Sequence, residues 1–219
     1  MLGLRVEGFL DDAKPRLLAD WVKNGGALVL ARGKPVTTAI ATLEPLYPMN
    51  WDAPVNTEFR WRPTSVGEEA GLFGADLPGR DGAIWQKMPP LQEARSGSDL
   101  KPFSQVLLEG VAMQGQRESR FPLIVSRRFG EGQVVTINCD DLWRWDFFPS
   151  FPEASQLYRD FWLQLFNWVV SYSDFLPGRD YALKVSHQSI EVDKPVRVRV
   201  MRRPGSQDKS EPKLVITRD

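Results

Sequence analysis

The sequence predicts an α/β domain built in three layers, followed by the first strands of a β-sandwich. Residues 2–31 combine a candidate strand, a helical apolar period, a Gly-Gly break and a short apolar run, which is the order of a βαβ unit. Residues 153–172 form a long amphipathic pattern, and after residue 181 the apolar period changes to two. We therefore predict an α/β domain at 1–177 and a partial β-sandwich segment at 178–219.

The N-terminal helix and the strand after it are the clearest local signals. Asp11 or Asp12 can cap the helix, and Asn24-Gly25-Gly26 can end it in the left-handed conformation that Gly favours. The apolar stripe of the helix contains Leu17, Leu18, Trp21 and Val22. Ala27–Ala31 is a continuous apolar run, typical of a strand buried on both faces of a parallel sheet. Residues 2–7 are a candidate for an earlier strand.

The middle of the chain alternates irregular and regular patterns. Residues 34–100 carry many Pro, Gly and single aromatic residues, so we expect long ordered loops with short elements. Residues 106–108 predict a short strand. Residues 123–128 and 133–138 flank Phe-Gly-Glu-Gly and predict a hairpin.

The C-terminal segment predicts strands. Residues 181–185, 196–200 and 213–217 alternate or are rich in apolar residues. Three strands in this length cannot bury a sandwich core, so we expect the chain to be part of a longer polypeptide.

Composition excludes several classes of function. The chain has 219 residues with 28 basic and 28 acidic side chains, so it lacks the basic excess of a nucleic-acid or polybasic membrane binder. No apolar run reaches the roughly 18 residues of a membrane span, so we expect no direct membrane insertion by this segment. A single Cys and a single His exclude an internal disulfide and a multi-Cys or His-rich metal centre, and we predict no metal and no cofactor.

The order of several segments resembles the class I glutamine amidotransferase-like domain. It is most similar to the domain found in large bacterial membrane-associated proteins that also carry von Willebrand A-type domains. The segments are LADWVKNGGALVL at 18–30, WQKMPPL at 85–91, LIV at 123–125, RFGEGQV at 128–134, DDLWRW at 140–145 and the helix around Phe161-Trp162. The resemblance covers roughly residues 4–175. It implies a flavodoxin-like three-layer fold, followed by an immunoglobulin-like β-sandwich segment.

The same resemblance argues against the amidotransferase reaction. The family's nucleophilic Cys would fall near residues 31–34, which read Ala-Arg-Gly-Lys, and its His-Pro-Glu segment would fall near 139–141, which read Cys-Asp-Asp. Neither position holds the catalytic residue. We therefore expect a non-catalytic binding or scaffold module within a larger bacterial envelope-associated protein. Its partners would be other proteins or other domains of the same polypeptide. The segment itself would be soluble, and its parent membrane-anchored.

The contact surface should lie at the carboxyl edge of the sheet, where open α/β sheets bind ligands. The candidates are Arg32, Gly33, Asp140, Asp141, Trp143 and Arg144. Asp140 and Asp141 could act as an acid–base pair or hold a hard cation. Alternatively, one of them caps a turn and pairs with Arg144.

Two alternative functions remain open. The first is a hydrolase or amidotransferase that uses Cys139 or the Asp140/Asp141 pair. Adjacent carboxylates favour the thiol over the thiolate, and the single His, His187, lies in the other segment, where it is either an ordinary surface residue or a pH-sensitive contact.

The second alternative is a carbohydrate-binding module. The chain has eight Trp, and exposed Trp rings bind sugars by stacking. Trp21, Trp162 and Trp168 lie in helical patterns that need core residues. The candidates for a surface cluster are Trp51, Trp61, Trp85, Trp143 and Trp145.

Overall fold

The computed structural model divides into two compact units, Met1–Tyr172 and Ser173–Asp219. The residues that it describes are 13–31, 41–72, 87–97, 99–115, 117–171, 181–185, 197–202, 212, 213 and 215. The first unit holds the candidate site. The predicted strand at 2–7, the capping residues Asp11 and Asp12, and the break at 177–178 lie outside the described residues.

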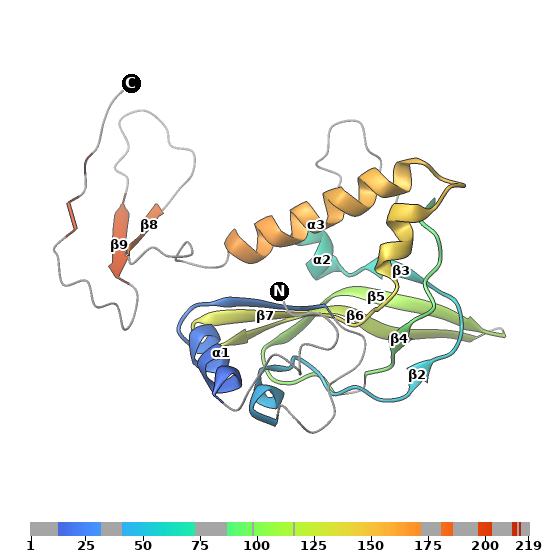
Figure 1. Cartoon of the computed structure of the whole chain (residues 1–219), viewed down its shortest axis with the longest axis horizontal. Coiled ribbons are helices and arrows are strands. Elements are labelled where there is room, and N and C mark those ends of the chain that lie inside the picture. The colour runs from blue at the N-terminus through green and yellow to red at the C-terminus, as the bar shows by residue number, and fades with distance from the viewer. Residues whose placement is uncertain are drawn as a thin grey trace. The chain divides into compact units, whose positions relative to one another are not determined.

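The first unit is built on a mixed β-sheet (Figure 1). Its described strands lie in the order β1, β7, β6, β5, β3. Strands β1 and β7 are parallel, and the other neighbours are antiparallel. The bounds of the strands are Ala27–Ala31 for β1, Phe59–Pro63 for β3, Ser104–Gln114 for β5, Arg117–Phe129 for β6 and Gly132–Ile137 for β7.

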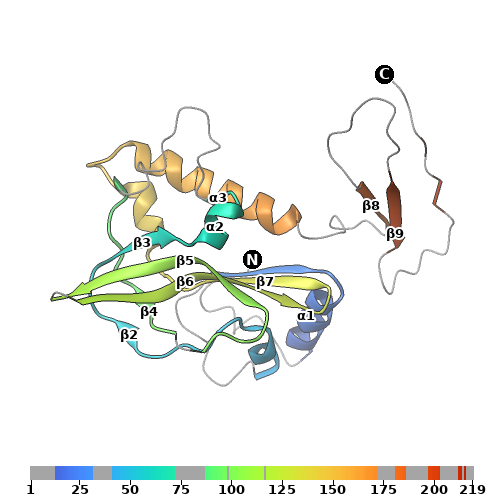
Figure 2. The same cartoon turned by 180° about the vertical axis from the view of Figure 1, so that it is seen from behind.

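Helices cover both faces of this sheet (Figures 1 and 2). Helix α1 (Lys14–Lys23) and the 3-10 helix η2 (Ala41–Leu46) pack on one face. The other face carries the short helix α2 (Ser65–Glu69), the 3-10 helix η4 (Leu142–Phe147) and the long helix α3 (Glu153–Ser171). The described part of the unit is therefore an α/β structure with a central sheet between two helical layers.

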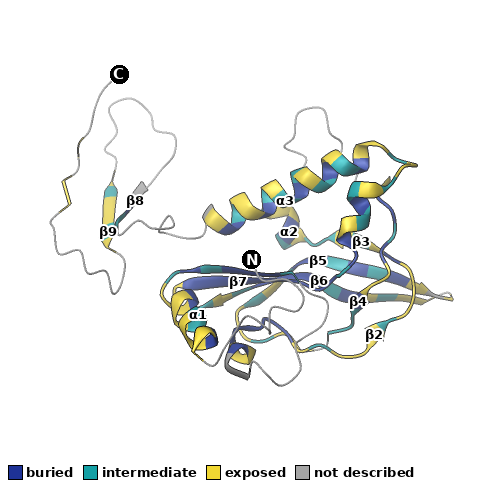
Figure 3. Ribbon diagram, viewed as in Figure 1, coloured by how far each residue is buried: buried dark blue, intermediate teal, exposed yellow. Residues whose placement is uncertain are grey.

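Strand β1 shows why its sequence is apolar at every position. Leu28 and Leu30 belong to the core under α1 and η2, whereas Val29 belongs to the core under α3. Both faces are buried, so neither face selects polar residues. Figure 3 shows the same buried centre along β1 and β7. The prediction of a strand buried on both faces and paired in parallel is confirmed.

The predicted hairpin is formed by β6 and β7, which pair from Ile124↔Ile137 to Phe129↔Gly132. Gly130 has a φ of 62°, which Gly adopts without the strain that a side chain would bring. At Gly132 a Cβ atom would lie 1.9 Å from the Val22 carbonyl oxygen, so only Gly lets α1 approach the hairpin this closely. The Gly-Glu-Gly sequence therefore serves both the turn and the packing of α1.

The helical predictions hold with differences at the N-terminus. Helix α3 begins at Glu153 as expected. Helix α1 begins at Lys14, and its N-cap is Ala13, which has no side chain able to cap. Trp21, expected in the core, is exposed, and its ring lies against Gly26, where a Cβ would come within 2.5 Å of the ring. The missing side chain at Gly26 makes room for the ring at the surface.

The irregular middle segment contributes more sheet than its sequence predicts. Strand β3 lies within it and extends the main sheet beside β5. Strands β2 (Pro54–Val55) and β4 (Ala94–Arg95) form a separate antiparallel pair. The strand predicted at 106–108 is part of the longer β5, because it pairs along its length with β6.

The second unit contains an antiparallel pair, β8 (Tyr181–Val185) and β9 (Val198–Arg202). Of the third predicted strand at 213–217, the structure describes residues 213 and 215, and neither belongs to a strand. The α/β class predicted for the first unit is the class observed. Its described sheet contains a single parallel pair, fewer than the doubly wound sheet of a flavodoxin-like domain has.

Candidate functional site

The predicted site lies where β7 leaves the sheet. Cys139, Asp140 and Asp141 follow directly after the strand, and η4 begins at Leu142. Strand β7 alternates between the two cores, with Val135 and Ile137 under α3, and Cys139 lies in that same core. The thiol is therefore directed into the protein interior by the alternation of the strand.

Asp141 forms the centre of a buried polar cluster, which we call the Asp141 clasp. Its side chain is almost fully buried, with the residue 2% exposed. The Cys139 thiol donates a hydrogen bond to Asp141 Oδ1 at 2.8 Å, and the backbone N–H of Gln92 donates to Oδ2 at 2.7 Å. Arg144 Nη1 lies 3.6 Å from the same Oδ2. Both carboxylate oxygens of Asp141 therefore have partners inside the protein.

The chain at 89–95 lies along this corner and closes it. The Asp140 N–H donates to the Glu93 carbonyl at 3.0 Å, and Ala94 forms a β-bridge with Cys139. Farther along the corner, Trp145 Nε1 donates to the Pro89 carbonyl at 3.1 Å. Backbone pairing and the Trp145 side chain therefore join the two segments at this corner.

Asn138 binds the end of the 89–95 segment at Arg95. Its Nδ2 donates to the carbonyl of Arg95 at 2.6 Å and to that of Pro122 at 2.8 Å, and its backbone N–H donates to Leu123. The residue is fully buried. Asn138 thereby ties the 89–95 segment to strand β6 as well as to β7.

The environment of Cys139 keeps its sulfur protonated. Burial raises the pKa of the Cys139 thiol well above its ordinary value, and the negative charge of Asp141 raises it further. A nucleophilic Cys needs the opposite, namely a lowered pKa from a cation, a His or a helix N-terminus. In the hydrogen bond to Asp141 the Cys139 thiol is the donor, and a thiolate would have no proton to donate.

The tryptophan candidates separate into core and surface residues. Trp145 is buried, with its ring centroid 5.4 Å from that of Trp61. Trp51 is partly buried and packs edge-on against Tyr47. Trp143 is 57% exposed and lies next to the exposed Phe147, with ring centroids 6.3 Å apart. A surface aromatic pair therefore exists on η4, made by Trp143 and Phe147.

The structure brings some of the predicted residues together. Cys139, Asp141 and Arg144 meet in the Asp141 clasp, and Trp143 projects from the same 3-10 helix. Arg32, Gly33, Trp85 and His187 lie outside the described residues. Among the residues that the structure describes, no group of three or more acidic, His or Cys side chains could hold a metal ion. No helix within the described ranges is long and apolar enough to cross a bilayer.

Sequence reasoning missed the segment that closes the corner. Gln92 contributes only its backbone N–H and Pro89 only its carbonyl, so side-chain identity carries no signal for either contact. The pairing also joins positions about fifty residues apart, which no local period can reveal.

No family model and no curated protein match this chain. Similar solved structures include a cytoplasmic protein from Salmonella typhimurium LT2, with 22% identity, coverage of 73% of this chain and 61% of that one, and a TM-score of 0.46. A second Salmonella typhimurium cytoplasmic protein has 17% identity, coverage of 76% and 65%, and a TM-score of 0.48. A β-galactosidase from Rahnella sp. R3 has 12% identity, coverage of 80% and 24%, and a TM-score of 0.46.

This chain thus spans less than two thirds of the length of either cytoplasmic protein and about a quarter of the β-galactosidase. These similarities assign no activity to it.

Proposed function

We propose that this chain is a non-catalytic binding or scaffold module with an amidotransferase-like α/β fold. The observation that supports this most strongly is the Asp141 clasp, in which the one thiol of the chain and both oxygens of a neighbouring carboxylate bind groups of the protein itself. Side chains that are occupied in this way stabilise the corner and are not available to a substrate.

The chemistry of the corner supports the same proposal. Thiol catalysis needs a thiolate and a base to accept its proton, whereas Cys139 is buried and its pKa is raised by burial and by Asp141. Carboxylate catalysis needs two groups that reach one substrate, whereas Asp141 is buried and fully engaged and Asp140 is only partly buried. The alternative of a hydrolase is therefore the weaker one.

An activity assay tests the proposal. Purified protein is incubated with glutamine and a panel of amides and esters, alongside Cys139→Ala, Asp140→Asn and an exposed control, Asp99→Asn. We expect ammonia or acid release at the level of buffer for all four proteins. Turnover by the unmodified protein that is lost in Cys139→Ala or Asp140→Asn, and kept in Asp99→Asn, would contradict the proposal.

A second candidate function is carbohydrate binding, which the exposed pair Trp143 and Phe147 favours. An exposed indole beside a second ring offers the apolar surface on which a sugar face stacks. Trp143→Ala and the matched buried-ring control Trp145→Phe are titrated with a glycan panel, following tryptophan fluorescence. Saturable quenching that Trp143→Ala abolishes would establish the site, and a flat response across the panel would exclude it.

The wider setting of the module is also part of the proposal. The resemblance suggests a flavodoxin-like first domain and β8–β9 as the first strands of an immunoglobulin-like sandwich, within a larger bacterial protein anchored at the cell envelope. Antibodies raised against this chain test the setting in fractionated cells of its source. We expect a polypeptide larger than 24.9 kDa in the membrane fraction. A band of 24.9 kDa that is found only in the soluble fraction would contradict the proposed setting.

A further inference from the structure

The 3-10 helix η4 has an inward and an outward side. With three residues per turn, Leu142 and Trp145 lie above one another, and both are buried. Trp143 and Phe147 are exposed, and their ring planes are inclined by 61°. The outward side therefore offers the flat face of an indole with a second ring beside it.

Contacts inside the protein hold this helix in place. Trp145 Nε1 donates to the Pro89 carbonyl at 3.1 Å. Asp146 Oδ1 accepts a hydrogen bond from Ser155 Oγ at the start of α3. Because the backbone of η4 is already fixed, a ligand that binds its rings avoids the entropy cost of ordering a mobile loop.

Arg144 places polar groups beside the rings. It lies three positions before Phe147, so the two residues share one side of η4. Its Nη1 lies 3.6 Å from Asp141 Oδ2, an ion pair longer than a hydrogen bond, and its side chain is 40% exposed. Within the described part of the chain, no hydrogen bond occupies the N–H groups of this guanidinium. The buried Asp141 therefore holds the guanidinium near the rings and leaves its donors available to a ligand.

The charge around the rings is negative. Residues 140–159 contain four carboxylates and two guanidiniums, namely those of Asp140, Asp141, Asp146, Glu153, Arg144 and Arg159. Each guanidinium already lies near a carboxylate, Arg144 at 3.6 Å from Asp141 and Arg159 at 3.9 Å from Asp146. A ligand that carries carboxylate, sulfate or phosphate groups would therefore meet a net repulsion at this surface.

We propose that the outward side of η4 binds a neutral glycan, with a sugar ring stacked on Trp143 and sugar hydroxyls hydrogen-bonded to Arg144. An aromatic ring offers an apolar face to the sugar, and a guanidinium offers fixed donors to its hydroxyl oxygens. This inference rests on the carbohydrate-binding candidate above. It adds the charge class of the glycan and the side chain that binds its hydroxyls.

The polar neighbours favour a sugar over other occupants. An apolar pocket on a partner protein would cover the partly exposed side chains of Arg144 and Asp146 and offer them no hydrogen bonds in place of water. Anionic lipid head groups and nucleic acids would face the excess of carboxylates. A neutral sugar has hydroxyl groups that donate and accept, so it can bind both kinds of side chain.

Affinity electrophoresis in native gels tests the charge class with matched polymers. Laminarin, galactomannan and arabinoxylan are neutral, and each is compared with its carboxymethylated form, which has the same backbone. We expect at least one neutral polymer to retard the protein and its carboxymethylated form to bind about tenfold more weakly in low salt. The difference should narrow in high salt, because salt screens the repulsion.

Variants test the assigned side chains in the same gels. Trp143→Ala should abolish the retardation. Arg144→Gln should weaken binding about tenfold, the loss of about one hydrogen bond from a charged donor. Arg144→Lys keeps a cation for Asp141 but lacks the planar fork of donors, so it should also bind more weakly. The control Arg128→Gln, on an exposed residue of β6, should bind like the unmodified protein, and equal binding by all three Arg variants would overturn the role of Arg144.

The outcomes separate this inference from the function on which it rests. If no neutral polymer retards the protein, the carbohydrate-binding candidate fails and this inference fails with it. Trp143-dependent binding that is as strong for a carboxymethylated form would keep carbohydrate binding and overturn the neutral class. Trp143-dependent binding to poly-L-proline, without binding to any glycan, would make the rings a protein contact and overturn both.

Discussion

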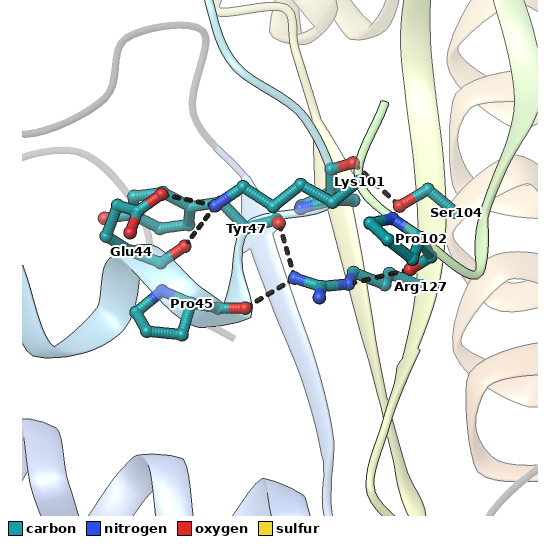
Figure 4. A network of polar contacts seen from close by, with 8 residues as sticks. Glu44, Pro45, Tyr47, Lys101, Pro102, Ser104 and Arg127 are labelled. Atoms are coloured by element: carbon teal, nitrogen blue, oxygen red, sulfur yellow. Dashed lines mark hydrogen bonds and ion pairs between the residues drawn. The ribbon is translucent and has the colours of Figure 1, made fainter. Parts of the chain in front are cut away.

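The Asp141 clasp and the contacts around the turn at residues 101–104, which we call the turn clamp (Figure 4), are built from similar polar contacts but have different results. Each joins segments that are distant in the sequence, 92 with 141 in the first and 45 with 127 in the second. In the clasp the contacts surround a thiol and a carboxylate and remove both from solvent. In the turn clamp the contacts lie around the base of a turn and leave its central ring exposed.

The two sets of contacts differ in which side chains they enclose and which they leave exposed. The corner directs the Cys139 and Asp141 side chains inward, where their contacts stabilise the fold. The turn presents Phe103, whose φ of 65° lies in the left-handed region and whose ring is exposed.

The largest expected effect comes from weakening the clasp. In Asp141→Asn a single carbonyl oxygen replaces two carboxylate oxygens, and an NH₂ group is directed at a donor. A buried donor is left without an acceptor and Arg144 loses its ion pair, so the free energy of unfolding should fall by about 3 kcal/mol. Urea unfolding followed by tryptophan fluorescence measures it.

Asp99→Asn is the matched control, because Asp99 is exposed and makes its described contact through its backbone carbonyl. Its free energy of unfolding should change by less than about 0.5 kcal/mol. Equal losses in the two variants would show that the clasp contributes no more than a surface charge.

A smaller effect is expected from weakening the turn clamp. Arg127→Met keeps much of the aliphatic chain but removes the donors to three carbonyls. The site is partly open to water, which can replace some of these bonds, so the loss should be about 2 kcal/mol. The neighbouring Arg128→Met, on an exposed side chain of the same strand, should be close to neutral, and a loss matching that of Arg127→Met would contradict the assigned role.

The smallest effect is a pH dependence caused by Cys139. Its thiol pKa is raised in the folded protein, so above about pH 8.5 the unfolded chain releases this proton while the folded chain keeps it. The stability contribution is therefore complete below that pH and is lost as the pH rises, by at most about 1.4 kcal/mol per pH unit. Melting curves between pH 7 and 10 should show a steeper decline for the unmodified protein than for Cys139→Ala, and parallel curves would contradict it.

The parts of the fold that the sequence predicts are those with strong local signals. Helix α3, strand β1 and the β6–β7 hairpin follow from apolar period, continuous apolar runs and Gly-rich turns. Strand β3 was not predicted, because it is short and its main-sheet partner β5 lies about fifty residues away. The helical period predicts a core position for Trp21, but the ring lies at the surface next to Gly26, which leaves room for it.

For the candidate site, sequence reasoning identified the residues but not their enclosure. The sequence pattern indicates Cys139, Asp141 and Arg144, and an ion pair between an Asp and Arg144 is one of the two interpretations it allows; the structure has this ion pair. The closure by residues 89–95 depends on backbone groups, which carry no sequence signature. The strained turn was also missed, since Lys-Pro-Phe-Ser gives no sign that Phe103 takes a positive φ.

Thiol labelling measures most directly whether the corner is closed and inert. Native protein is mixed with a large excess of a disulfide reagent at pH 7.5, and the rate at Cys139, the single thiol of the chain, is compared with the rate in urea. We predict labelling no faster than global unfolding in the native protein and rapid labelling in urea. Labelling of the native protein at a rate near that of the unfolded chain would show an accessible, ionisable sulfur and would contradict the non-catalytic assignment.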